Sequence, residues 1–173
     1  MSAATAPKSP SSSLSAPSAD RRRTSPLLRL LTLEALDRPG IRDLGLLVLR
    51  LGMLGIFLHG LHKATGYAGF HGVVAQAPVG SLAPGLFSFM VVAGQLVLGI
   101  TLALGLFTRW SGFFMALMFV FIIVLFNLPR GLIDAKTGGI SFESSLYYFV
   151  PAVTLLLTGP GRISLDHLLT RRG

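Results

Sequence analysis

The chain has 173 residues, of which 51% are hydrophobic and only 13% are charged, and its mean hydropathy is +0.68. A soluble domain of this size usually carries about twice that share of charged residues. The net charge of +8 would suit nucleic acid, but the positive residues gather in the N-terminal segment and at the ends of apolar stretches. There is no basic stripe with interleaved aromatic residues, so we exclude nucleic acid and expect the lipid bilayer, with its anionic head groups, as the partner.

Cysteine is absent from the sequence. The chain therefore forms no disulfide and holds no cysteine-ligated metal or iron–sulfur cluster of its own. Any electrons in a redox reaction must then be carried by a bound cofactor or by another subunit, and we expect no covalently attached cofactor.

The N-terminal segment differs in composition from the remainder of the chain. Residues 1–26 are rich in Ser, Ala, Pro and Arg, so they cannot bury enough apolar surface to fold, and we predict a disordered tail. Residues 27–42 form a juxtamembrane segment in which 27–36 can lie as a helix on the membrane surface, before a break at 37–40.

The remainder of the chain has long stretches without charge, which separate Lys63 from Arg109, Arg109 from Arg130, and Glu143 from Arg162. Each stretch is long enough for a membrane span of about 20 residues. We predict an all-α fold: an integral membrane four-helix bundle over residues 43–161, with a disordered N-terminal tail and a basic C-terminal tail at 162–173. The expected helices cover residues 43–63, 84–107, 110–127 and 142–158.

The predicted connections are less regular. Residues 64–83 are uncharged but interrupted by Gly and Pro, so we expect a loop with a short surface or re-entrant turn. Pro151 lies inside the fourth predicted helix and should kink it, and Gly159-Pro160-Gly161 should end it.

The distribution of Lys and Arg predicts the orientation. Arginines are frequent before the first helix, and others lie in the loop between the second and third helices and in the C-terminal tail. The two remaining loops hold only Lys63, Arg130 and Lys136. By the positive-inside rule, four spans with both termini in the cytoplasm fit this pattern.

The first predicted helix ends in a group of polar side chains. An α-helix turns by about 100° per residue, so His59, His62 and Lys63 fall on one face. Gly52 and Gly55 lie on the same face, where small residues allow a second helix to approach closely.

Three stretches resemble the DoxX family of small bacterial membrane proteins. They are LRLGMLGIFLHGLHKATG (49–66), AGQLVLGITLALGLFTRW (93–110) and TGPGRISLDHLL (158–169). The resemblance implies a four-helix bundle in the bacterial cytoplasmic membrane and a link to respiratory or oxidative-stress redox systems, in some members as a subunit of a quinone-linked oxidoreductase. The family often has a glutamate in the middle of the second helix, where this chain has Gln95.

The strongest candidate site combines His59, His62 and Lys63 with Glu143, because the first and fourth helices bring these residues to the same outer level of the membrane. Tyr147 lies one turn below Glu143 on the same face. A neutral histidine can hydrogen-bond a quinone carbonyl, and a carboxylate can exchange the proton that follows reduction. The alternative is a structural Glu143–Lys63 ion pair.

Other polar residues have simpler interpretations. Gln95 either forms a hydrogen bond between helices or touches a ligand beneath the head-group site. His59, His62 and His71 are suitable metal ligands by type, but an HxxH pair alone is weak, and we predict no metal site. We expect four residues to anchor the chain at the membrane interface: Arg50, which would reach lipid phosphate or pair with an aspartate, and Arg109, Trp110 and Arg162.

The favoured function is a quinone-interacting or membrane-anchoring subunit of a redox system. A second hypothesis is a non-catalytic scaffold that recruits a soluble redox enzyme through the charged termini. A small-molecule transporter is the third, and it is disfavoured because four short helices show no inverted repeat.

Overall fold

The computed structural model describes residues 38–135 and 137–171. The predicted N-terminal tail and the predicted surface helix at 27–36 lie outside the described residues. Within the described ranges the chain is helical, and its only β-structure is an isolated bridge between Ile133 and Ile140. The predicted all-α class is confirmed.

The longer helices are α2 (Pro39–Gly52), α3 (Leu54–Thr65), α5 (Pro84–Leu104), α6 (Thr108–Ile122) and α7 (Glu143–Thr158). Two short helices, α4 (Tyr67–Ala75) and α8 (Leu165–Thr170), occupy stretches that are predicted to be a loop and a tail. Shorter turns complete the described part: the 3-10 turns η2 (Gly80–Leu82) and η4 (Leu128–Arg130), and the π-helical turn η3 (Ile123–Asn127).

Three helical segments are long and apolar enough to cross a membrane, namely Pro39–Thr65, Pro84–Leu104 and Thr108–Arg130. The fourth predicted span, α7, has 16 residues, which is about 24 Å of helix against a hydrocarbon thickness of about 30 Å. The integral-membrane class is therefore confirmed with three full-length spans among the described residues, and α7 is a shorter fourth helix.

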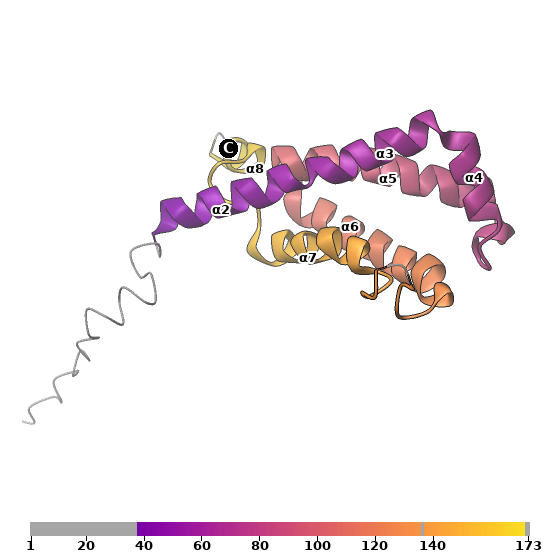
Figure 1. The fold of residues 1–173 in the computed structure, drawn as a ribbon. Coiled ribbons are helices and arrows are strands. Elements are labelled where there is room, and N and C mark those ends of the chain that lie inside the picture. The colour runs from indigo at the N-terminus through magenta and orange to yellow at the C-terminus, as the bar shows by residue number, and fades with distance from the viewer. Residues whose placement is uncertain (1–37, 136, 172–173) are drawn as a thin grey trace, which may run out of the picture. The chain divides into compact units, whose positions relative to one another are not determined.

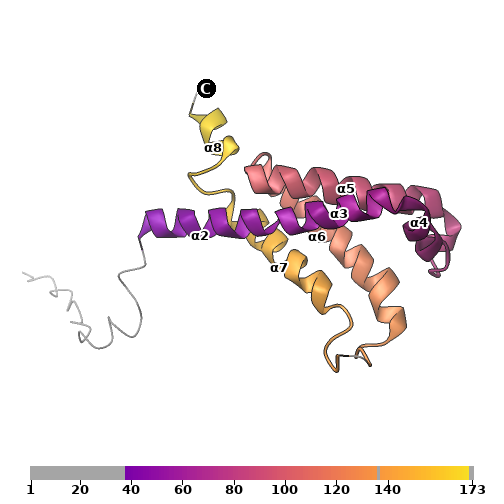
Figure 2. The same cartoon turned by 45° about the horizontal axis from the view of Figure 1, so that its top comes forward.

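The first span is built from α2 and α3, which continue each other as one rod in both views (Figures 1 and 2). Pro39 occupies the first turn of α2, where its missing N–H costs nothing. Met53 joins the two helices with φ −70° and ψ −12°, values close to helical, so the direction of the chain is kept.

Glycines end two of the helices. Gly105 adopts φ +68° after α5, and the N–H groups of Gly105 and Leu106 bond back to the last turn of the helix. This stop explains why α5 is three residues shorter than predicted. Gly159 adopts φ +80° after α7, at the position where the sequence predicts the helix to end.

The spans pack as two tight pairs. In the first pair, α3 and α5 meet at Gly60 and Gly99: a Cβ atom at Gly60 would lie 2.8 Å from the Cβ of Gln95, and one at Gly99 would lie 3.0 Å from the Phe57 nitrogen. In the second pair, a Cβ at Gly112 of α6 would lie 2.8 Å from the Ala152 carbonyl oxygen of α7. These glycines allow the backbones to approach, as in other membrane helix pairs.

The predicted glycine face on the first span is partly wrong. A Cβ atom at Gly52 would meet nothing within 4 Å, so this glycine is not a packing contact, while Gly55 does face α7 through the Tyr148 hydroxyl. A helical wheel places residues around an axis but does not say which sector another helix covers. Here α5 covers the sector that holds Gly60.

The core between the pairs is apolar and includes Met53, Ile56, Leu102, Met115 and Leu155. The outer surfaces of the same helices expose large hydrophobic side chains, such as Leu58, Phe89, Val97 and Leu157. An apolar exterior around an apolar core is the arrangement expected when lipid replaces water as the surroundings.

Candidate functional site

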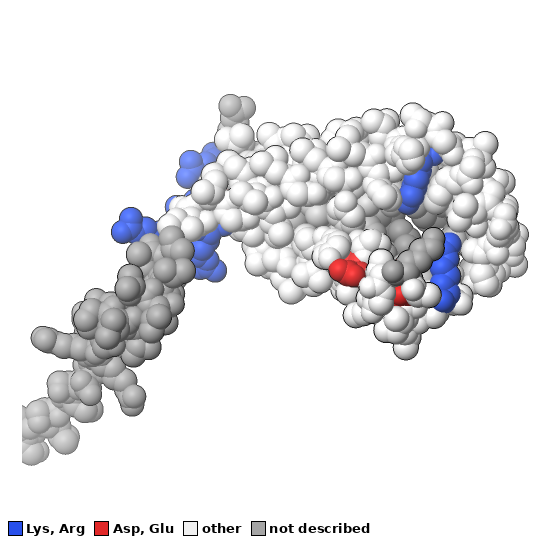
Figure 3. Space-filling view, in the orientation of Figure 1, with Lys and Arg blue, Asp and Glu red and all other residues white. Residues whose placement is uncertain are grey.

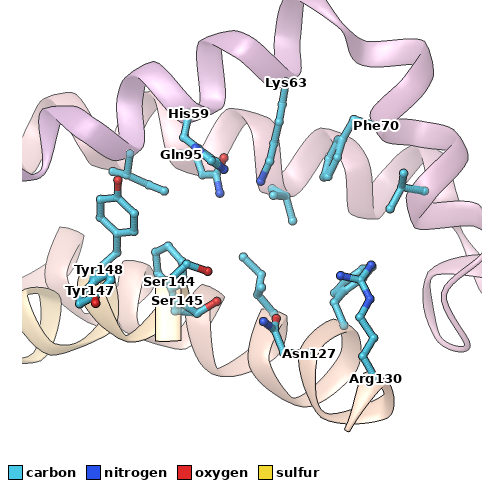
Figure 4. A pocket seen from close by; sticks show the side chains of 16 residues that line it. His59, Lys63, Phe70, Gln95, Asn127, Arg130, Ser144, Ser145, Tyr147 and Tyr148 are labelled. Atoms are coloured by element: carbon cyan, nitrogen blue, oxygen red, sulfur yellow. The ribbon is translucent and has the colours of Figure 1, made fainter. Parts of the chain in front are cut away.

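A cavity of about 410 Å³ opens between the two helix pairs, beside η4 and the start of α7 (Figure 4). Residues from α3, α4 and α5 form one wall, and residues from α6, η3, η4 and α7 form the other. The cavity is also visible from outside as a hollow with basic side chains on opposite sides (Figure 3). Its lining residues are Ile56, His59, Lys63, Phe70, Val73, Val91, Gln95, Phe119, Ile122, Phe126, Asn127, Arg130, Ser144, Ser145, Tyr147 and Tyr148.

The α3 wall carries His59 and Lys63, one turn apart. Both side chains extend from α3 into the space between the walls (Figure 4). The Lys63 ammonium lies 4.8 Å from the centre of the Phe70 ring, which α4 supplies. A cation over an aromatic face is attracted by the ring, so α4 holds the ammonium group at the cavity.

Gln95 forms the floor beside His59. Its side chain is 1% exposed, and its Oε1 atom has no hydrogen-bond partner among the described residues. The burial follows from Gly60, which lets α3 approach the Cα–Cβ stem of Gln95 closely. Because a buried amide oxygen without a partner is costly, this atom is a candidate acceptor for a donor group on a ligand.

The opposite wall is polar at its outer end. Asn127 belongs to the π-helical turn η3 and donates a hydrogen bond from Nδ2 to the Ser141 carbonyl at 3.0 Å. Arg130 follows in η4, and Ser144 and Ser145 begin α7. A π turn widens the helix locally and is frequent at functional sites, and here it carries two lining residues.

Tyr147 connects the cavity to a carboxylate outside it. Tyr147 lines the cavity, and its hydroxyl donates a hydrogen bond to Oε1 of Glu143 at 2.5 Å. Glu143 itself is exposed and does not line the cavity. The pair links a cavity wall to an exposed acid through one hydrogen bond, which is suitable geometry for proton exchange.

The structure therefore brings together four of the six predicted ligand-binding residues, namely His59, Lys63, Gln95 and Tyr147. His62 does not line the cavity. It lies about 60° round the helix from His59, on the side away from Lys63, which takes it past the edge of the wall to an exposed position. Glu143 acts at most through Tyr147.

Sequence reasoning missed Phe70, Asn127, Arg130 and the two serines. Phe70 lies in a stretch predicted to be a loop, because the uncharged, glycine-containing α4 carries no strong helical pattern. In the sequence, Arg130 stands out only as a loop charge. The one available signal is that Lys63 and Arg130 flank loops predicted to lie on the same side of the membrane.

The described residues contain no group of three His, Cys, Asp or Glu side chains placed to hold a metal ion. His71 lies on α4 and does not line the cavity. The absence of a metal site stays a prediction for the whole chain.

The four residues predicted to anchor the chain at the membrane interface lie at the end of the helices away from the cavity. Arg50 is predicted to reach lipid phosphate or to pair with an aspartate. Its side chain is 1% exposed, so the contact with lipid is wrong; a guanidinium N–H donates to the Ile163 carbonyl oxygen, and the guanidinium interacts electrostatically with Asp166. The C-terminal segment folds back over this part of the first span and covers Arg50, an arrangement that helical periodicity cannot reveal. Arg109, Trp110 and Arg162 are exposed, and their contact with lipid stays a prediction.

Residues 45–128 match the family model DoxX. The chain carries a DoxX domain. The predicted family resemblance is confirmed over this range, which runs from α2 to the first residue of η4. No curated protein and no solved structure matches the chain.

The DoxX match contains one wall of the cavity complete, with His59, Lys63, Phe70 and Gln95. Arg130 and the α7 residues lie beyond the matched range. Gln95, whose buried oxygen lacks a partner among the described residues, lies inside the matched range.

Proposed function

We propose that this DoxX-domain protein binds a quinone head group in the cavity between the two helix pairs and serves as a quinone-interacting membrane subunit of a redox system. The observation that supports this most is Gln95, whose buried amide oxygen has no partner within the described part of the chain and lies at the floor of a cavity that also presents His59 and Lys63.

The chemistry of the walls suits a quinone. A quinone carbonyl accepts hydrogen bonds, and His59 and Lys63 are donors on one wall, with Asn127 and Ser144 as polar groups on the other. The reduced quinol carries hydroxyl donors, and the Gln95 oxygen is a matching acceptor. Apolar lining residues, such as Ile56, Val91 and Phe119, suit the ring and the first units of an isoprenoid tail.

Reduction of a quinone to a quinol takes up two electrons and two protons. We assign the electrons to a partner redox protein that carries its own flavin or metal centre, because this chain has no cysteine to ligate an iron–sulfur cluster. We assign proton exchange to the Tyr147–Glu143 hydrogen bond, which reaches from the cavity wall to an exposed carboxylate.

The proposed location is the bacterial cytoplasmic membrane, with both termini in the cytoplasm. Two contacts support the placement of both ends of the helical domain on the same side of the membrane. The Arg162 N–H donates to Oδ1 of Asp43 at 2.9 Å, and Arg50 donates to the Ile163 carbonyl. The start of α2 therefore lies beside the start of the C-terminal segment. Arginines concentrate at this end, as the positive-inside rule requires of the cytoplasmic side.

The test is ligand protection against thermal unfolding. The purified full-length protein in detergent is titrated with a short-chain ubiquinone or menaquinone analogue, and we expect a saturable rise in Tm. Gln95→Leu removes the acceptor at nearly constant volume. It should weaken binding of the reduced, quinol form of the analogue, whose hydroxyl groups donate to that oxygen, about tenfold, which corresponds to about 1.4 kcal/mol. His59→Leu should weaken quinone binding to a similar extent.

Ser88→Ala is the matched control. Ser88 is also buried in α5, and its hydroxyl also lacks a partner among the described residues, but it does not line the cavity. We expect unchanged quinone protection in this variant. Protection that survives both Gln95→Leu and His59→Leu would place quinone elsewhere, and no protection of the unmodified protein would favour the scaffold hypothesis.

A further inference from the structure

A second polar cavity lies at the opposite end of the α6–α7 pair from the quinone site. It has a volume of about 480 Å³ and lies between the start of α6 and the C-terminal segment with α8. The residues that matter here are Thr108, Arg109 and Trp110 from α6, and Asp166, His167 and Thr170 from α8. The proposed quinone site uses none of them.

Two buried polar atoms in this cavity lack partners. Thr108 is 0% exposed, and its Oγ1 has no hydrogen bond among the described residues. His167 is partly buried, and its Nε2 atom is also inaccessible and without a hydrogen-bond partner among the described residues; this residue belongs to α8, about sixty residues later in the sequence. Two unsatisfied groups that converge from separate helices on one cavity indicate a missing polar ligand, since buried polar groups are nearly always paired.

The carboxylate in the cavity is already occupied. Oδ1 of Asp166 accepts the Phe107 N–H at 2.7 Å, and Oδ2 accepts the Thr108 N–H at 2.8 Å. The negative charge therefore caps the start of α6, where a helix favours an anion. Arg109 remains as the cation at the cavity, and its Nη1 is held by the Leu156 carbonyl at 3.2 Å, which leaves other guanidinium N–H groups for a ligand.

The surrounding charge favours an anion. Five exposed arginines lie at this end of the described chain. The two aspartates described at this end are both engaged: Asp166 caps α6, and Asp43 accepts the Arg162 N–H and lies 3.9 Å from the Arg162 guanidinium. The five are Arg38, Arg42, Arg109, Arg162 and Arg171. Trp110 is 66% exposed beside the cavity, and an exposed Trp next to an Arg is typical of the head-group level of a membrane.

We propose that this cavity is a binding site for the head group of an anionic phospholipid, whose phosphate accepts hydrogen bonds from Thr108, His167 and Arg109 while Trp110 lies against the glycerol region. The site is distinct from general attraction of lipid to positive charge, because Thr108 and His167 would bind the phosphate through directed hydrogen bonds from buried atoms. The proposal does not depend on the quinone site.

The experiment titrates the delipidated full-length protein in a neutral detergent with phosphatidylglycerol, phosphatidylcholine or inorganic phosphate, and follows Tm and the lipid adducts in native mass spectra. We expect saturable stabilisation by phosphatidylglycerol, at least fivefold tighter than by phosphatidylcholine. Inorganic phosphate at matched concentration should not stabilise the protein. Equal stabilisation by free phosphate would overturn the assignment to a lipid.

Thr108→Val and Arg109→Gln should each weaken phosphatidylglycerol binding by fivefold or more. Arg42→Gln is the matched control, because it removes the same charge from the same end but does not line this cavity, and its affinity should stay within twofold. Equal weakening in Arg42→Gln and Arg109→Gln would reduce the effect to general electrostatics and overturn the proposal. If Thr108→Val fails to fold, the two arginine variants still decide the question.

Discussion

Asp166 is predicted to be the residue whose loss most weakens the attachment of the C-terminal segment. Its carboxylate accepts two backbone N–H groups at the start of α6, from Phe107 and Thr108. Its own N–H donates to the Gly105 carbonyl at 2.9 Å, and Gly105 is also the residue against which the buried Arg50 side chain packs. One residue therefore connects α6, the end of α5 and the C-terminal segment.

The magnitude follows from these bonds. A hydrogen bond to a charged group contributes about 1.5–3 kcal/mol, so two contribute about 3–6 kcal/mol in Asp166→Ala. The Phe107 bond is exposed and its N–H can bind water instead, so we expect the lower end, about 3 kcal/mol. For a chain of this length that is a fall in Tm of about 6–12 °C.

The assay is thermal unfolding of the full-length protein in detergent, followed by circular dichroism without added lipid. Asp166→Asn keeps one acceptor oxygen and should lie between the unmodified protein and Asp166→Ala. Glu143→Ala is the control, since it removes the same charge from an exposed position at the other end and should shift Tm by less than about 3 °C. A shift in Asp166→Ala no larger than in this control would show that the Asp166 carboxylate does not stabilise the attachment of the C-terminal segment.

Three further outcomes are expected. Gly60→Val should destabilise the fold by more than about 2 kcal/mol in the same unfolding assay, because a Cβ at Gly60 would lie 2.8 Å from the α5 side chain beneath it. A Cβ at Gly52 would meet nothing within 4 Å, so Gly52→Ala should be neutral or stabilising by up to about 1 kcal/mol. Gly105→Ala should lower Tm, because φ is +68° there and the Arg50 guanidinium occupies the space of the new methyl group; a Tm equal to that of the unmodified protein would show that the turn can relax. Lys63→Met should weaken an ionised hydroxynaphthoquinone about tenfold more than a neutral naphthoquinone of equal size in the protection assay, because among the described lining residues the cavity then keeps Arg130 as its one full cation. Equal weakening of both ligands would show that the charge of Lys63 does not contribute to binding.

Much of the architecture is local in origin and could be predicted. Uncharged stretches between widely spaced charges predict membrane helices, since a charge inside a bilayer is costly. Pro84 at the start of α5 and Gly159 after α7 act through the backbone of their own residues, so the helix boundaries near them follow from the sequence. The same holds for the shared face of His59 and Lys63, which helical periodicity determines.

Other features depend on which helices meet. Gly52, Gly55 and Gly60 are equally small, and only the path of α5 decides that Gly60 is the close contact and that Gln95 is buried beneath it. Arg50 illustrates the same point: its periodicity suits a lipid-facing residue, but the returning C-terminal segment covers it.

Local patterns in the chain therefore predict the membrane class, the approximate helices and the polar end of the first span, because hydrophobic length, backbone preference and helical period are properties of neighbouring residues. Three features become visible only once the helices are packed: Glu143 reaches the cavity through Tyr147, Arg130 faces the α3 wall, and Thr108 and His167 share a second cavity. These are contacts between distant segments, and they depend on the packing of helix pairs that no local pattern encodes.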